Sequence, residues 1–98
     1  MSHIVENWSR VTGQVESWQP SGDQAPGLLL LRIRRVAAVP RADGDAYPSL
    51  LQATEGEVLT VRLSTSAAST LRVAAGRDIE LDVRRGRDPD LWFGRVTP

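Results

Sequence analysis

Arginine and tryptophan are the side chains of this sequence with the clearest potential for chemistry. The chain has 98 residues, with 12 basic residues balanced by 12 acidic ones, and every basic residue is arginine. A guanidinium group pairs with carboxylates and phosphates through a planar fork, and it also stacks on aromatic rings. Arginines beside aromatic side chains suit single-stranded nucleic acid, whose bases stack on rings while its phosphates meet cations.

The composition removes most of the usual material for catalysis and metal binding. There is no cysteine, and the single histidine is His3. Thiolate nucleophiles, cysteine-based metal sites and a Ser-His-Asp relay therefore lack their residues. Asp43 and Asp45 flank Gly44, but the further oxygen ligands and the closing glutamate of a calcium loop are missing, which favours a solvated turn. We expect a protein that is not an enzyme and holds no cofactor and no metal.

The charge balance limits the class of partner. A net charge of zero argues against a general nucleic-acid binder, because such proteins usually carry a basic excess that releases counterions. A local arginine patch is still compatible with that balance. Residues 1–10 lack the apolar stretch of a signal peptide, and the longest aliphatic run, 28–31, is too short to cross a bilayer. We expect a cytoplasmic protein without a membrane partner.

Glycine and proline clusters divide the chain into strand-like runs. Alternating or β-branched residues predict strands over 11–18, 27–39, 57–64, 78–84 and 91–96. An alanine-rich segment opened by hydroxyl residues predicts a short helix near 66–71 that stops at Gly76. We expect one domain over 1–98, with 1–10 as a candidate disordered segment and 40–56 as a loop insertion.

Alternation along each run assigns its side chains to two faces. Residues expected inward are Leu29, Leu31, Ile33, Leu59, Val61, Leu63, Ile79, Leu81 and Val83. The unbroken leucines 28–31 predict that both faces are covered at the start of the second run. In the last run Phe93 is expected inward, and Gly13 in the first run indicates a bulge or bend.

Three strands, a short helix and two more strands, with glycine in the first run and before the fourth, resemble the oligonucleotide/oligosaccharide-binding (OB) fold from about Val11 to Val96. The resemblance implies an all-β, five-stranded Greek-key barrel with one short helix between strands three and four. It also implies a ligand across strands two and three, gripped by the loops joining strands one to two and four to five. The residues carried onto that surface are Arg32, Arg34, Thr60, Arg62, Trp18, Arg85, Arg87 and Trp92.

A second resemblance covers residues 56–84, GEVLTVRLSTSAASTLRVAAGRDIELDVR. This strand, serine turn, leucine, glycine and strand pattern is similar to the transport-associated oligonucleotide-binding (TOBE) and molybdopterin-binding-like domains, which include small oxyanion binders. The resemblance implies an anion-contacting turn at Ser64, Thr65 and Ser66 and a basic position at Arg84 or Arg85.

Three functions follow as hypotheses. The first is a non-catalytic OB-type module for single-stranded DNA or RNA. The second is a structural or adaptor domain that docks a protein partner or a second copy through strand edges and exposed tryptophans. The third is a small oxyanion-binding domain.

A purely structural role for the same residues is the competing interpretation. The outward arginines Arg32, Arg34 and Arg62 would then form a solvated charge ladder of small energetic value. Trp8 and Trp18 would cover an open end of the barrel. The carboxylates expected to pair with these arginines are Glu57, Glu80 and Asp82.

Overall fold

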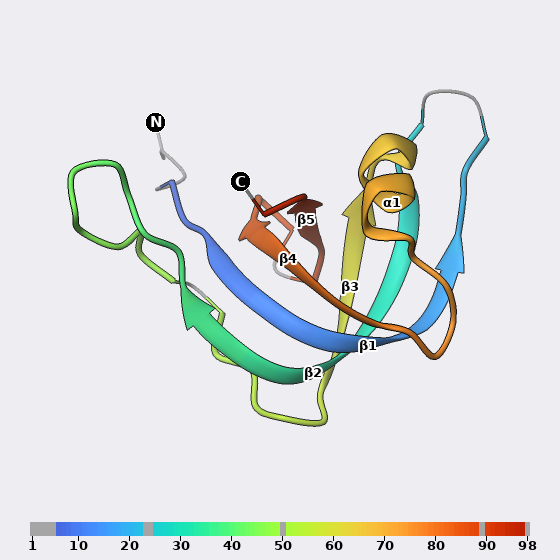
Figure 1. Cartoon of the computed structure of the whole chain (residues 1–98), viewed down its shortest axis with the longest axis horizontal. Coiled ribbons are helices and arrows are strands. Elements are labelled where there is room, and N and C mark those ends of the chain that lie inside the picture. The colour runs from blue at the N-terminus through green and yellow to red at the C-terminus, as the bar shows by residue number, and fades with distance from the viewer. Residues whose placement is uncertain (1–5, 23–24, 50, 89, 98) are drawn as a thin grey trace.

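The five alternating runs form the strands of a closed β-barrel (Figure 1). The computed structural model describes residues 6–22, 25–49, 51–88 and 90–97. Its elements are β1 (Ser9–Gln19), β2 (Gly27–Ala38), β3 (Val58–Leu63), α1 (Thr65–Leu71), β4 (Asp78–Arg85) and β5 (Trp92–Arg95). The strand order around the barrel is β1-β2-β3-β5-β4; β3 and β5 are parallel, and the other neighbours are antiparallel. The predicted all-β barrel with a helix between the third and fourth strands is confirmed.

The core consists of the inward side of each strand. All nine residues predicted to face inward on β2, β3 and β4 are buried. Val11 and Val15 of β1, Trp92 of β5, and Ala67 and Ala68 complete this cluster. Because the side-chain period of a strand is two, filling the barrel with these residues places the intervening polar side chains on its outer surface.

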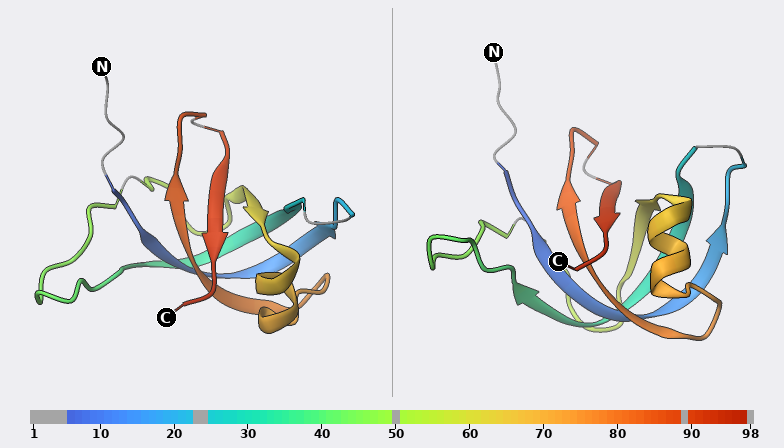
Figure 2. Two further views of the ribbon diagram at one scale, coloured as in Figure 1. Left: turned by 90° about the horizontal axis from the view of Figure 1, so that it is seen from above. Right: turned by 45° about the horizontal axis from the view of Figure 1, so that its top comes forward.

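The bend of β1 depends on Gly13. The β1–β2 register shifts between Thr12 and Gly13, which confirms the predicted bulge. A Cβ atom at Gly13 would lie 2.5 Å from the carbonyl oxygen of Arg32 and 2.9 Å from the Cγ atom of Leu31. The missing side chain therefore allows β1 to approach β2 closely while it also pairs with β4. Both views of Figure 2 show β1 and β2 curving together along one side of the barrel.

The helix α1 packs its alanines on the core. Ser64 is its N-cap, with the Oγ atom accepting a hydrogen bond from the Ala67 N–H at 3.1 Å. Ala67 and Ala68 are buried against the core. The predicted short helix near 66–71 is confirmed, but its C-cap is Arg72 and not Gly76, which lies in the turn before β4. Within the described part of the chain, no helix is long and apolar enough to span a membrane.

The expected burial of both faces at the start of β2 is wrong. Leu28 and Leu30 are 37% and 36% exposed, and Val58 on the adjoining strand is 44% exposed. Leu30 pairs with Thr60 and Leu28 with Arg62, so the alternate leucines face outward beside polar side chains. The run of leucines reflects an apolar outer surface and not a second packed layer.

The inward position predicted for Phe93 is also wrong. Trp92 is 7% exposed and belongs to the core, whereas Phe93 is half-buried. Parallel pairing aligns Trp92 with the inward Val61, and Phe93 with the outward Arg62. The pairing of β5 with β3, which is distant in the sequence, therefore determines which side chains of β5 point into the barrel.

The chain is structured earlier than expected. β1 begins at Ser9, and Trp8 and Asn7 before it are buried. The Asn7 side chain donates to the Arg85 carbonyl at 3.2 Å and accepts from the Arg85 N–H at 2.9 Å. These contacts join residues 6–10 to the barrel and correct the expectation of disorder there; residues 1–5 lie outside the described residues.

The close approach at Gly13 predicts a large cost for a small substitution. Gly13→Ala should lower the free energy of unfolding by about 2 kcal/mol, because the added methyl group meets backbone atoms that cannot move freely. Urea unfolding followed by circular dichroism measures this change. Ser17→Ala on the same strand should change stability by less than about 0.5 kcal/mol. Equal effects of the two substitutions would show that the bulge does not require glycine.

Candidate ligand-binding face

One row of outward side chains crosses four strands, from a position near the start of β2 to a position near the end of β4. The register aligns Leu28 with Arg62, Arg62 with Phe93, and Phe93 with Arg84. Leu28, Arg62 and Arg84 are exposed, and Phe93 is half-buried. We call these four residues the cross-strand row. It places one aliphatic, one aromatic and two cationic side chains side by side.

Phe93 and Arg84 form a stacked pair within the row. The Arg84 Cζ atom lies over the Phe93 ring, 5.2 Å from its centroid. A Cβ atom at Gly86 would lie 2.8 Å from Cε2 of that ring, so the ring packs closely beside the bare backbone of Gly86. Among the described residues, no carboxylate forms an ion pair with Arg62 or Arg84. Both cations therefore remain available to an anionic ligand.

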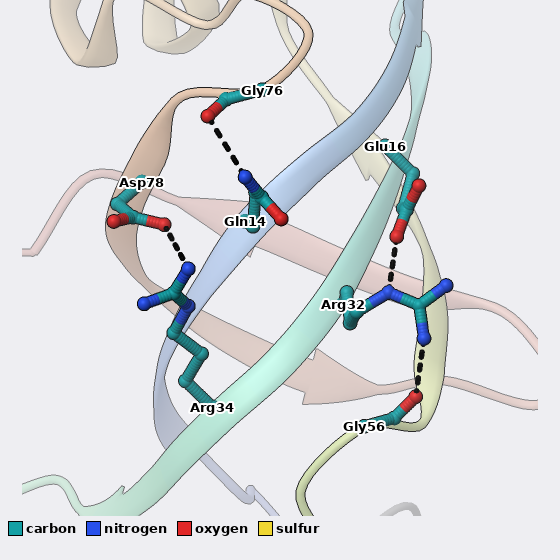
Figure 3. Close-up of polar contacts among 7 residues, drawn as sticks. All are labelled: Gln14, Glu16, Arg32, Arg34, Gly56, Gly76 and Asp78. Atoms are coloured by element: carbon teal, nitrogen blue, oxygen red, sulfur yellow. Dashed lines mark hydrogen bonds and ion pairs between the residues drawn. The ribbon is translucent and has the colours of Figure 1, made fainter.

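Arg32 and Arg34, by contrast, are engaged in contacts around β1 (Figure 3). The Arg32 Nε–H donates to Glu16, and its Nη1 donates to the Gly56 carbonyl at 3.0 Å. The Arg34 Nη2 atom lies 3.4 Å from Asp78 Oδ1. These arginines form surface ion pairs of the kind that contributes at most about 1 kcal/mol each.

The charge ladder exists, but its partners differ from those expected. Glu57, Glu80 and Asp82 pair with neither Arg32 nor Arg34 among the described ion pairs. β1 lies between β2 and β4 in the barrel, so arginines of β2 meet carboxylates on β1 and at the start of β4. The spacing of residues along the sequence does not show that β1 lies between β2 and β4.

The structure divides the remaining predicted site residues among separate places. Thr60 is half-buried beside the row, opposite Leu30. Arg85 and Trp92 line a cleft of about 390 Å³ together with residues 49, 51–53, 57 and 59, and Trp92 also belongs to the core. Arg87 is exposed in the segment after β4. Trp18 packs against the core and lines a separate cleft with residues of α1.

The cross-strand row contains Phe93 and Arg84, which were not among the site residues predicted from the OB resemblance. Phe93 was expected inside, and Arg84 was considered only for anion binding. Their joint placement comes from the β3–β5 and β4–β5 registers, which align positions 62, 93 and 84. Alternation within β4 identified Arg84 as outward, whereas no local pattern identified Phe93.

The expected oxyanion turn is not assembled as a site. The Ser64 hydroxyl already accepts the Ala67 N–H as the helix cap. β5 lies between β3 and β4, and it therefore separates the Ser64 turn from Arg84 and Arg85. No cluster of three or more His, Cys, Asp or Glu side chains suited to a metal ion occurs in the described part of the chain.

Asp82 is an outward carboxylate whose side chain is completely buried. Its register neighbours are Arg10 on β1 and Arg95 on β5. The Arg10 Nε–H donates to Asp82 Oδ1 at 2.9 Å, and the Arg95 Nη2 atom lies 3.5 Å from Oδ2. This hydrogen bond with Asp82 raises the pKa of Arg10 above its ordinary value. The Arg95 guanidinium also stacks on Trp8, with Cζ 3.6 Å from the ring centroid.

The two kinds of ion pair should differ in energy. Asp82→Asn leaves two guanidinium groups beside a neutral side chain in a buried position, and should lower the free energy of unfolding by about 1 to 3 kcal/mol. Asp78→Asn removes an exposed partner of Arg34 and should cost less than about 0.5 kcal/mol. Urea unfolding of both variants makes the comparison. A loss at Asp82 no larger than at Asp78 would show that the buried cluster does not stabilise the barrel.

Comparisons with protein-family models, with curated proteins and with solved structures each find no match to this chain. The closed five-stranded barrel is compatible with an OB-type fold. Because one barrel architecture supports many unrelated sites, function has to be inferred from the chemistry of its surface.

Proposed function

We propose that this chain is a non-catalytic binding module of the OB type, and that it binds single-stranded nucleic acid on the cross-strand row. The stacked Arg84–Phe93 pair beside Arg62 carries the proposal. OB-type barrels hold ligands between the loops that join strands one to two and four to five. Leu28 follows the first of these segments directly, and Arg84 and Phe93 lie on either side of the second.

The chemistry of the row fits a flexible polyanion. A base stacks on an aromatic ring or a guanidinium plane, and such stacking contributes about 1 to 3 kcal/mol per base. Arg62 supplies a cation one strand away, at a position aligned with Phe93. Arg85 and Arg87 add positive charge where β4 ends. A strand crossing the row would thus meet a stacking surface and cations together.

The zero net charge is compatible with such a local patch. Five arginines are paired with carboxylates: Arg10, Arg32, Arg34, Arg41 and Arg95. Arg62, Arg84 and Arg87 have no ion pair in the described structure. Asp88, close to Arg87, accepts the Asp90 N–H at 2.9 Å and is thus engaged with the backbone. Arg85 is likewise without an ion pair, so four of the seven arginines that have none among the described residues lie on or beside the row; the other three are Arg35, Arg72 and Arg77.

A second candidate function, self-association as an adaptor, is supported by the exposed aliphatic side chains of β2 and β3. Leu28, Leu30 and Val58 lie on one outer face. The occupant we assign to it is a second copy, because a chain of zero net charge has little overall repulsion against itself. Strand edges and exposed tryptophans were the surfaces expected for this role. In the closed barrel each strand pairs on both sides, and Trp8 and Trp92 are buried, so this aliphatic face takes their place in the hypothesis.

Nucleic-acid binding is tested with a labelled oligothymidine of about 15 nucleotides, long enough for one OB-type site. Fluorescence anisotropy should show saturable binding that weakens with salt. The double variant Arg62→Ala/Arg84→Ala should bind at least about tenfold more weakly, and its salt dependence should fall by roughly 1.4 in log–log slope.

The matched control removes the same charge elsewhere. Arg35→Ala/Arg77→Ala changes two exposed arginines that have no ion pair among the described residues, and affinity should change less than about threefold. Absence of binding by the parent chain at low salt, or equal losses in both double variants, would refute the assignment.

Self-association is tested by light scattering over about 10 μM to 1 mM, a range that covers weak dimers. The second candidate predicts a dimer population that rises with concentration and is lost in Leu30→Ser. A constant monomer mass would exclude the second copy as occupant of this face.

A further inference from the structure

A separate cleft lies between α1 and the end of β1. Its volume is about 300 Å³, at the lower end for small-ligand sites. The lining residues are Trp18, Thr65, Ala68, Ser69, Arg72 and Val73. Figure 2 shows α1 running alongside the final part of β1 in the right-hand view. None of these residues belongs to the cross-strand row.

Arg72 occupies an unfavourable backbone position at the edge of this cleft. It caps the C-terminus of α1 in the left-handed region, with φ 55° and ψ 49°. Among the described residues it is the one non-glycine residue with positive φ. Glycine or asparagine usually occupies such a cap, because a Cβ atom is disfavoured there. An arginine at this position therefore suggests that its side chain has a use that offsets the backbone cost.

Among the described residues, the polar side chains of the cleft have no hydrogen-bond or ion-pair partner. The Arg72 guanidinium makes no ion pair or side-chain hydrogen bond in the described part of the chain, and neither do the Thr65 and Ser69 hydroxyls. Thr65 and Ser69 are four residues apart on α1 and therefore share one side of the helix, and the C-cap Arg72 follows Ser69 by three residues. The lining of the cleft thus includes a cation and two hydroxyls.

Trp18 supplies a packed aromatic ring to the lining of the same cleft. Its ring is half-buried and packs against the core. A Cβ atom at Gly27 would lie 2.5 Å from the Cη2 atom of this ring, so the indole rests on bare backbone. Because the ring is already packed, a ligand that stacks on it does not have to order it first.

We propose that this cleft binds a small planar aromatic anion, with its ring on Trp18 and its carboxylate or phosphate on the Arg72 fork. Thr65 and Ser69 provide hydroxyl donors to the same anionic group. A guanidinium fork matches both carboxylate and phosphate in geometry. The inference does not depend on nucleic-acid binding, because the two sites share no side chain.

Four probes test the aromatic ring and the anionic group of the proposed ligand, together and one at a time. Adenosine 5′-monophosphate carries a ring and a phosphate, phenylacetate a ring and a carboxylate, adenosine a ring alone, and inorganic phosphate an anion alone. Tryptophan fluorescence reports binding, because Trp18 lines the cleft whereas Trp8 and Trp92 are buried. We expect saturable quenching by at least one of the first two probes and at least tenfold weaker effects from the last two. The stronger of the first two identifies the combination of ring and anionic group that the cleft prefers.

The decisive variant is Arg72→Gly, which removes the cation and relieves the backbone at once. Its melting temperature should be equal to that of the parent or a few degrees higher, by relief of the left-handed strain. Its affinity for the effective probe should fall at least tenfold. Trp18→Phe should abolish the quenching, and Arg77→Ala should leave both affinity and melting temperature unchanged.

Three results would overturn the proposal. One is the absence of quenching by both aromatic anions at millimolar concentration. Another is an Arg72→Gly variant that binds as tightly as the parent. The third is a melting temperature more than about 5 °C lower in that variant, which would assign Arg72 a structural role.

Discussion

Closure of the barrel depends on β4, which has to pair with β1 on one side and with β5 on the other. Asp82 lies near the middle of that strand, and Arg10 and Arg95 approach its carboxylate from the two neighbouring strands. A buried carboxylate is costly unless it is paired, so the cluster favours the arrangement in which both flanking strands are in register. Stacking of Arg95 on Trp8 extends the same contact to the segment that precedes β1. One charge cluster thus connects the first, fourth and fifth strands.

This arrangement also decides which arginines remain for a ligand. Arg10 and Arg95 are committed to Asp82, and Arg32 and Arg34 meet carboxylates around β1. The arginines of the cross-strand row have no such partners in the described structure. A chain without net charge can therefore carry a local basic surface, because most of the ion pairs between its charged side chains form on other faces of the barrel. The positions at which charged side chains form ion pairs, more than the net charge of the chain, determine the electrostatic character of a given surface.

The parts of the structure that were predictable are those set by local periodicity. Alternation along β2, β3 and β4 identified the core correctly, and Gly13 indicated the bulge. The faces of Trp92 and Phe93 were not predictable in this way, because they are set by parallel pairing with β3. The burial of Asp82 likewise requires two arginines from other strands. For the candidate site, the basic character was visible in the sequence, whereas the grouping of Arg62, Phe93 and Arg84 needed the barrel registers.

Three features contradict the preferences of an isolated strand or helix: the buried Asp82, the exposed leucines of β2, and the left-handed Arg72. Departures of this kind usually have either a structural compensation or a functional reason. Asp82 is compensated by the arginines on both sides. The leucines and Arg72 lack a comparable compensation among the described residues, and each lies on a surface that an external partner can reach. By this physical test Asp82 belongs to the architecture, and the other two are the positions at which we propose binding.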